Sequence, residues 1–165
     1  MSRCRQSHEP GHRRKFLVVI DHTPECGRAV HYAARRAART GGAIVMLSVL
    51  ELADVQSQWL GVAGLMREEA TDKATSRQEQ FTARVRALSG VPCEPVIREG
   101  KIAEEITRLI EADEDIAILV LASGTGKEGP GPLVSALSTG AWGHLPVPIT
   151  LVPGGLSDEE IDALA

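Results

Sequence analysis

The apolar residues of this chain gather in short runs, most of which do not alternate with polar residues. Unbroken apolar runs of this length are typical of strands that helices cover on both faces. We expect strands at residues 16–20, 43–50, 93–98, 116–121 and 147–152. The third of these contains Pro95, which has no N–H to give to a sheet, so that strand is expected near an edge.

Helical patterns separate the predicted strands. Thr23 is expected to cap the first helix, with Pro24 at its first position, because this position needs no N–H. Apolar spacing predicts further helices over residues 65–88, 102–110 and 133–142, whereas residues 51–64 show no firm period and are expected to form a loop. The resulting order is βαβαβαβαβ. Because parallel crossovers are right-handed, this order predicts an α/β fold with a doubly wound, open, five-stranded parallel sheet and helices on both faces.

The charge pattern divides the chain into three parts. We expect a disordered basic tail at residues 1–14, a single α/β domain at residues 15–153 and an acidic tail at residues 154–165. In the acidic tail, Ser157 and Glu160 have the spacing of a capping box, which predicts a short helix docked on the domain or on a partner. The alternative is a solvated acidic terminus.

Composition restricts the partners and the compartment. With 165 residues, 3% aromatic residues and a net charge of −4, the chain has the size of one domain with an aliphatic core and no general attraction for nucleic acid or anionic lipid. It has no secretory signal, no run of ~20 apolar residues and an odd number of cysteines, which favours free thiols. We therefore expect a cytoplasmic protein that binds neither nucleic acid nor membrane.

Two segments at the carboxyl ends of strands are candidates for ligand binding. One is the turn from Asp21 to Pro24, and the other is the loop at residues 122–132, ASGTGKEGPGP. Ligands of doubly wound sheets bind at this edge, and glycines let backbone N–H groups approach a phosphate closely. A plain flexible loop remains the alternative. Asp21 likewise either receives hydrogen bonds from a ligand or satisfies nearby amides at the start of the helix.

Residues 124–129 also match the dinucleotide pattern G-x-G-x-x-G, but they follow the fourth strand, not the first, and no acidic residue lies ~20 positions on. Lys127 is not a Walker lysine, because Glu128 takes the place of the Ser or Thr that would hold magnesium. The sequence shows no catalytic triad and no metal-binding cluster, and we predict neither catalytic nor metal-ligating residues.

Three segments resemble the universal stress protein family. They are FLVVIDHTPECGRAVHYAARRAA, REGKIAEEITRLIEADEDIAILVLASGTG and LPVPITLVP, which occur in the family's order. The resemblance covers residues 15–153. It implies a five-stranded sheet, a homodimer through the strand at residues 147–152 and, in one branch of the family, binding of ATP or AMP. An interior position of that last strand, which needs no partner, is the alternative.

In the nucleotide-binding branch the loop reads Gly-x2-Gly-x9-Gly-Ser/Thr. Counted back from the last strand, this motif falls on Ala122, Thr125, Ser135 and Ala136; counted from Gly126 and Gly129, it ends on Thr139 and Gly140. Neither register fits fully. The candidate nucleotide-binding residues are Asp21, Thr23, Val45, Ala122, Gly124, Thr125, Gly126, Gly129 and Ser135.

Three hypotheses of function follow. The first is a module of stress response or signalling that binds an adenine nucleotide, and the second is a nucleotide-free dimeric interaction protein. The third is a slow ATPase, which ranks last because the loop shows no recognisable metal ligand or water-positioning group. Whether the chain is an enzyme is left open.

Overall fold

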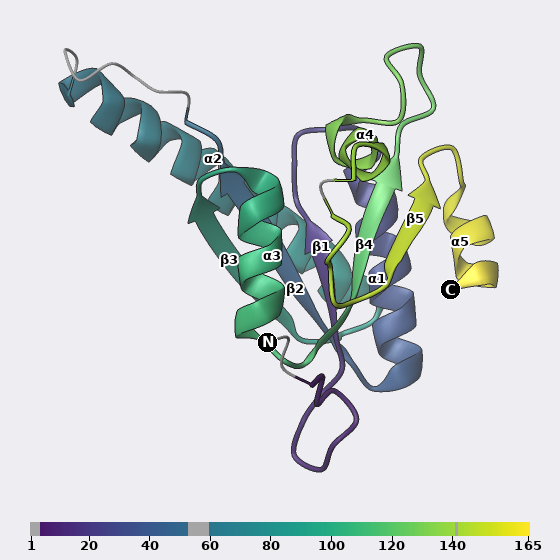
Figure 1. The fold of residues 1–165 in the computed structure, drawn as a ribbon. Helices are drawn as coiled ribbons and strands as arrows, with labels where there is room; N and C mark the ends of the chain where they lie inside the picture. The colour runs from purple at the N-terminus through teal and green to yellow at the C-terminus, as the bar shows by residue number, and fades with distance from the viewer. Residues whose placement is uncertain (1–3, 53–59, 141) are drawn as a thin grey trace.

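A computed structural model describes residues 4–52, 60–140 and 142–165 of the chain. Its centre is a five-stranded sheet in which every pairing is parallel (Figure 1). The strands are β1 (Lys15–Val19), β2 (Ala43–Leu50), β3 (Cys93–Glu99), β4 (Ile116–Ser123) and β5 (Ile149–Pro153). Their order, β3-β2-β1-β4-β5, confirms the predicted doubly wound sheet and the edge position of the strand with Pro95.

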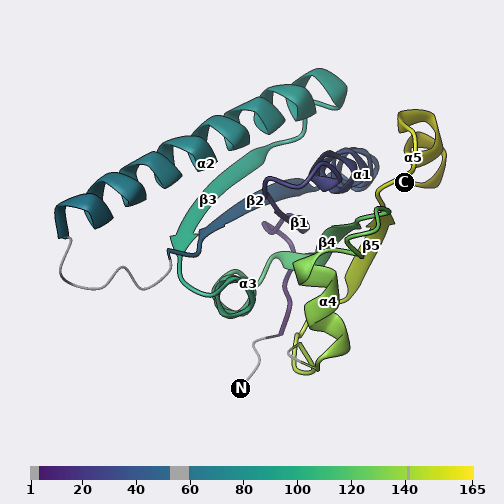
Figure 2. The same cartoon turned by 90° about the horizontal axis from the view of Figure 1, so that it is seen from above.

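Helices cover both faces of the sheet, as predicted. They are α1 (Cys26–Thr40), α2 (Leu60–Leu88), α3 (Ile102–Ala112), α4 (Pro132–Ser138) and α5 (Asp158–Leu164). Seen from above, α1, α2 and α5 lie on one side of the sheet, and α3 and α4 lie on the other (Figure 2). Along β1, Phe16 and Val18 pack under α1, whereas Leu17 and Val19 pack toward α3 and α4. Both alternations are buried, which explains the unbroken apolar runs.

Helix α1 begins later than predicted. Its N-cap is Glu25, without a side-chain capping bond, and Thr23 lies in the turn before it. The prediction of Thr23 as the cap is wrong because α1 begins at Cys26; the Thr23 hydroxyl instead donates to Asp21 Oδ1, 2.5 Å away.

Helix α2 begins earlier than predicted, at Leu60, so the expected loop at residues 51–64 is wrong from there on. The first turns of α2 extend past the sheet (Figures 1 and 2), where Val62, Leu65 and Met66 are exposed. A helix without a buried face has no apolar period, so the sequence pattern could not show it. Residues 53–59 of the predicted loop lie outside the described residues.

The last helix before the C-terminal tail and the last strand are both shorter in the structure than the sequence predicts. Helix α4 ends at Ser138, not at residue 142, and β5 begins at Ile149, not at residue 147. Val147 is nevertheless buried, in the core beneath α4. Pro148 directly precedes the strand and still accepts a bond from Leu119 N, 3.0 Å away.

One buried polar side chain joins three elements. Gln78 on α2 is 3% exposed, and its Nε2 lies 3.0 Å from Met46 O on β2 and 2.9 Å from Val96 O on β3. It also lies 3.1 Å from the hydroxyl of Ser48. Because a buried amide without partners is costly, these bonds fix where α2 sits over the two strands.

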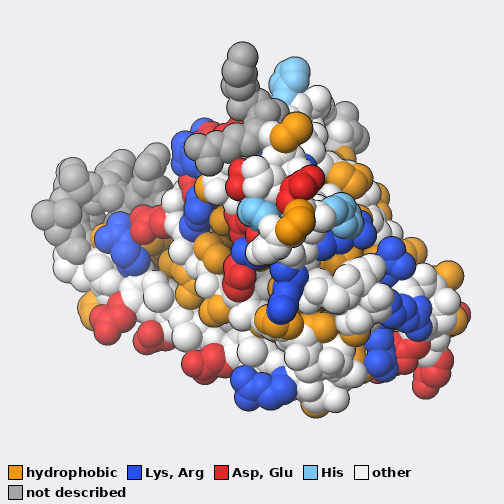
Figure 3. All heavy atoms as spheres, turned by 90° about the horizontal axis from the view of Figure 1, so that it is seen from below, with side chains coloured by type: hydrophobic (Ala, Val, Ile, Leu, Met, Phe, Trp, Pro, Cys, Tyr) orange, Lys and Arg blue, Asp and Glu red, His pale blue; other side chains and the backbone are white. Residues whose placement is uncertain are grey.

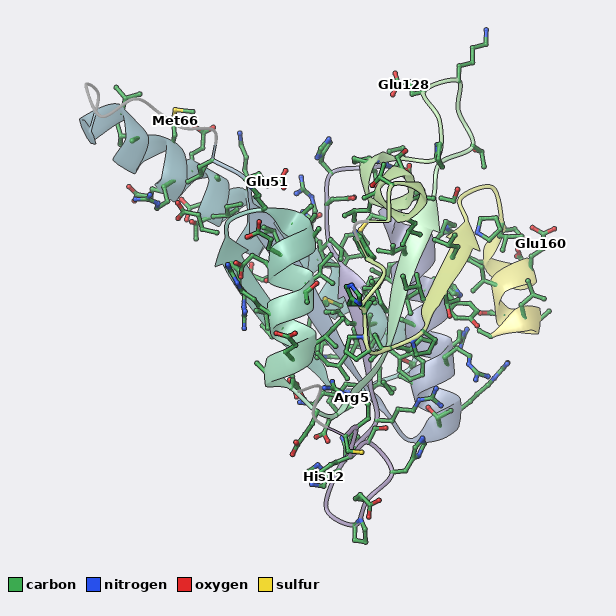
Figure 4. All side chains as sticks on the ribbon, in the orientation of Figure 1. Arg5, His12, Glu51, Met66, Glu128 and Glu160 are labelled. Atoms are coloured by element: carbon green, nitrogen blue, oxygen red, sulfur yellow. The ribbon has the colours of Figure 1, made fainter. Side chains whose placement is uncertain are left out.

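The residues before β1 lie beneath the sheet. Figure 4 shows Arg5 and His12 there, close to the base of α3. Arg5 donates to the carbonyl of Ile110, 2.6 Å away, and His12 Nδ1 lies 2.6 Å from Asp115. The sequence predicts disorder for residues 1–14; in the structure, residues 5 and 12 make these contacts with the domain. The boundary at residue 15 stays a prediction.

Viewed from this side, cationic and anionic side chains are interspersed over the surface (Figure 3). None of the helices in the described part of the chain is long and apolar enough to cross a membrane.

Helix α5 is attached to α1 by ion pairs. Asp158 Oδ1 lies 2.6 Å from Arg28, and Asp162 Oδ1 lies 2.7 Å from both His31 Nε2 and Arg35 Nε. The hydrogen bond from Arg28 holds the pKa of Asp158 below its ordinary value, and the hydrogen bond from Arg35 does the same for Asp162. Both carboxylates are therefore charged whenever α5 is docked at neutral pH.

The predicted capping box starts this helix: Ser157 Oγ accepts from Glu160 N, and the Glu160 side chain, labelled in Figure 4, accepts from Ser157 N. The apolar residues in and before this helix differ in burial: Ile161 is fully buried, Leu156 packs against the same cluster, and Leu164 is 65% exposed.

Candidate functional site

The two candidate segments meet at one end of the sheet. β1 and β4 are neighbours and run parallel, with Val18 opposite Val120, so the turn after β1 and the loop after β4 emerge side by side. A cavity of about 950 Å³ opens there. Its lining comes from His22, Thr23, Pro24, Glu25, the loop residues 124–129, Gly131, Pro132, Ser135 and Gly154.

The cavity brings together most of the predicted site residues. Those that line it are Thr23, Gly124, Thr125, Gly126, Gly129 and Ser135. Asp21 and Ala122 line a second, much smaller cavity of about 20 Å³, which shares Thr23, Glu25 and Gly131 with the large one. Val45 lines neither cavity, because it is 1% exposed inside the sheet.

Asp21 organises the turn after β1. Its Oδ1 accepts from the backbone N of Thr23 at 2.9 Å and from the Thr23 hydroxyl at 2.5 Å. Of the two roles considered for Asp21 in the sequence, these bonds match the second, in which its carboxylate accepts from a nearby amide. The bonds also fix the position of Thr23, which lines both cavities, so Asp21 acts on the site by holding Thr23 in place.

The loop after β4 is closed by its own backbone. Gly124 N donates to Pro130 O at 3.1 Å, and Gly129 N donates to Gly126 O at 3.2 Å. These two glycine amides are therefore already engaged. The amides of Thr125, Gly126 and Lys127 donate to no acceptor among the residues that the structure describes, and they remain able to bind an anion.

A buried thiol lies behind the turn. Cys26 lines the small cavity, and burial raises the pKa of its thiol to about 12, because the thiolate would lose its hydration. The thiol is therefore protonated at neutral pH and is a poor nucleophile. The described residues contain no cluster of three or more His, Cys, Asp or Glu that could hold a metal ion.

The fold and this site can now be compared with known proteins. A sequence model of the universal stress protein family matches residues 12–153. The chain belongs to this family. Among curated proteins, none matches the chain.

Solved structures of the family share the fold. The universal stress protein UspA from Lactobacillus plantarum is similar with a TM-score of 0.73 at 17% identity, covering 84% of this chain and 97% of its own. A universal stress protein from Archaeoglobus fulgidus in complex with dAMP gives 0.60 at 12% identity, covering 84% and 97%. A family protein from Arabidopsis thaliana with AMP bound gives 0.58 at 18% identity, covering 88% and 94%. At these identities the likeness establishes the fold.

The two registers of the family's nucleotide-binding motif fall at different places. Ser135, which belongs to the register counted from the last strand, lines the cavity. Thr139 and Gly140, which end the other register, follow the C-terminal end of α4 and are not part of the lining. Of the two registers, the one counted from the last strand is therefore the one that places its serine in the lining.

Two lining residues, Glu25 and Gly154, lie outside both segments and the other residues that the sequence indicated. Glu25 was expected inside the helix, but the late start of α1 leaves it at the N-cap, facing the loop. Gly154 N donates to Ser123 O at 2.8 Å, which brings the chain after β5 against the end of β4. Only the spacing Gly154–Gly155 directly after a strand signalled this close approach.

Proposed function

We propose that this universal stress protein binds an adenine nucleotide, ATP or AMP, in the cavity at the carboxyl ends of β1 and β4. The observation that carries the proposal is the cavity itself, about 950 Å³ in volume and lined by the glycine loop. Pockets for small ligands commonly measure about 300–1,000 Å³. A nucleotide-binding module of this kind would act in stress response or signalling by reporting the level of its ligand.

Solved relatives support the choice of ligand. Structures with the same fold are described in complex with cAMP, with dAMP and with AMP. In this chain, Thr23 and the neighbouring Asp21 would contact the base or ribose, and the amides of Thr125 and Gly126 would bind phosphate. Ser135 would add a hydroxyl from α4.

Two measurements test the proposal. Mass spectrometry of small molecules released from the purified, denatured protein should find an adenine nucleotide. Calorimetric titration of the ligand-free protein should then show binding of AMP or ATP and much weaker binding of GMP and GTP at the same concentrations. If no adenine nucleotide is retained and none binds at millimolar concentration, the proposal is wrong.

A second candidate is a nucleotide-free, dimeric interaction protein, which the incomplete loop motif favours. Here we propose that the chain forms a homodimer through residues 147–152. β5 is an edge strand and Leu151 is 44% exposed, so a second copy would cover both its apolar side chain and its free backbone groups. Light scattering at micromolar concentration tests the dimer, and a stable monomer would exclude it.

The third hypothesis, slow ATP hydrolysis, stays a prediction, and release of phosphate from ATP by the purified protein tests it. The cytoplasmic location also stays a prediction.

A further inference from the structure

The glycines of the cavity gather around one carboxylate, that of Glu25. A methyl group added to Gly124 would lie 3.1 Å from Glu25 Oε1, and one added to Gly131 would lie 3.6 Å from the same atom. A methyl group on Gly154 would lie 2.9 Å from Glu25 Cβ. The space that a glycine loop leaves open for an anion is therefore bordered by an anion of the protein itself.

The charge of Glu25 has no nearby cation to balance it. Among the described residues, no Lys, Arg or His forms an ion pair with its carboxylate, whereas Arg28, three residues on, pairs with Asp158. Glu25 lies at the N-terminus of α1, a helix of 15 residues that carries a partial positive charge at this end. This same partial charge would otherwise attract a phosphate.

The other charged side chains of the cavity lie farther out. Lys127 and Glu128 are exposed, and Figure 4 shows Glu128 at the far tip of the loop, away from the sheet. They carry opposite charges on adjacent residues, so their fields largely cancel at a distance. The inner part of the cavity, next to Gly124 and Gly131, therefore borders the negative charge of Glu25, and Asp21 in the adjoining small cavity has the same sign.

We propose that Glu25 is a specificity-determining residue of this site, and that its carboxylate makes the site select adenosine or adenosine monophosphate over ATP. The proposal rests on the proposed binding of adenine nucleotides. Like charges repel, and each further phosphate adds negative charge at the end of the cavity where Glu25 stands. A nucleoside or monophosphate brings little or no such charge.

The test is a set of calorimetric titrations with adenosine, AMP and ATP, in EDTA, on the wild type and on Glu25→Gln. The amide keeps the shape of the side chain and removes its charge. Without the carboxylate, the affinity for ATP should rise about tenfold, the affinity for AMP by less, and the affinity for adenosine should stay the same. In the wild type, ATP should bind more weakly than AMP.

The matched control is Glu111→Gln, which makes the same change of charge on an exposed face of α3 and lines neither cavity. It should leave all three affinities as in the wild type. Thermal unfolding of both variants verifies that they fold, and Glu25 makes no side-chain capping bond whose loss would destabilise α1.

Three results would overturn the proposal. An ATP affinity that Glu25→Gln does not raise means that the carboxylate does not face the phosphates. If the ATP titration is repeated with Mg²⁺ in place of EDTA, an affinity that falls in this variant means that Glu25 helps to hold a cation. Equal gains for adenosine and ATP mean that the effect is not one of charge. Failure of the parent proposal is a distinct result, because then neither protein binds any of the three ligands.

Discussion

Helix α1 meets carboxylates at two places, and the two differ in how their charge is balanced. Along its side, Asp158 and Asp162 of α5 each lie within 2.7 Å of a cationic side chain. At its N-terminus, Glu25 lies beside three glycines and no ion-pairing partner within the described residues. Paired charges of the first kind hold elements together, whereas an unpaired charge in a cavity is free to act on a ligand. The contrast separates a contact that serves the fold from one that we propose serves binding.

The largest expected effect concerns the apolar part of the α5 contact. Ile161 is fully buried, so Ile161→Ala should lower the free energy of unfolding by about 2–5 kcal/mol, measured by urea denaturation. Leu164→Ala is the matched control, because Leu164 is 65% exposed, and it should change stability by less than about 0.5 kcal/mol. Equal losses for the two variants would show that α5 docks on a different face.

The next prediction compares the loss of stability when alanine replaces each of two glycines of the loop. A methyl group on Gly124 would lie 2.9 Å from the carbonyl oxygen of Gly129, so Gly124→Ala should cost about 1–3 kcal/mol of stability. A methyl group on Gly126 meets nothing within 4 Å, and Gly126→Ala should cost less than about 0.5 kcal/mol. Thermal unfolding of both variants measures the difference. If the two melt alike, the loop is not closed as the structure shows it.

The ion pairs of α5 should make its docking dependent on pH. Because the hydrogen bonds from Arg28 and Arg35 lower the pKa of Asp158 and Asp162 in the folded state, their stabilisation is complete above the ordinary pKa, about 3.9, and is lost as the pH falls through the lowered values. The protection factors of the α5 amides, which are the intrinsic exchange rates divided by the observed rates at the same pH, should therefore be high at pH 6 and lower near pH 3.

Asp162→Asn removes one of these titrating groups, so its loss of protection relative to the wild type should be visible at pH 6 and should shrink near pH 3. Glu159→Gln, on an exposed position of the same helix, should exchange like the wild type at both values. A loss in Asp162→Asn that is the same at both pH values would mean that its ion pairs do not contribute.

The smallest expected effect concerns Lys127, the cation at the loop tip. Because Lys127 is exposed and the amides of Thr125 and Gly126 have no acceptor among the described residues, Lys127→Ala should weaken binding of AMP by less than about threefold. Gly126→Val should weaken it more, since the added side chain meets no protein atom and can only obstruct the ligand. Calorimetry compares the two. Equal losses would make the lysine a principal phosphate ligand.

The sequence predicted the parts of this molecule that depend on local pattern. Buried strands such as β1 and β4 carry apolar residues on both faces, and crossover chirality leaves few ways to arrange them, so their neighbouring positions were predictable. The capping box of α5 is likewise a local pattern. It predicted the start of that helix correctly.

The remaining features depend on contacts that no local pattern records. Helix α1 begins after a turn in which Thr23 bonds to Asp21, and this start leaves Glu25 at the N-cap beside the cavity. The close approach of Gly154 to Ser123 is a tertiary contact between two residues that lie 31 positions apart in the sequence. Val45 was named as a candidate although the apolar run at residues 43–50 itself predicts a buried strand, and the structure shows Val45 1% exposed inside the sheet.

Gln78 bears on a different matter, the alignment of neighbouring strands. The first six residues of β2 are buried on both faces, so sliding this strand by one residue past β3 would exchange one set of buried apolar side chains for another, with little penalty from burial. The amide of Gln78, held between Met46 O and Val96 O, is satisfied only when these two residues lie opposite their observed neighbours. Replacing it with leucine should therefore leave the core apolar but permit shifted pairings, visible as doubled amide signals from β3 in NMR spectra.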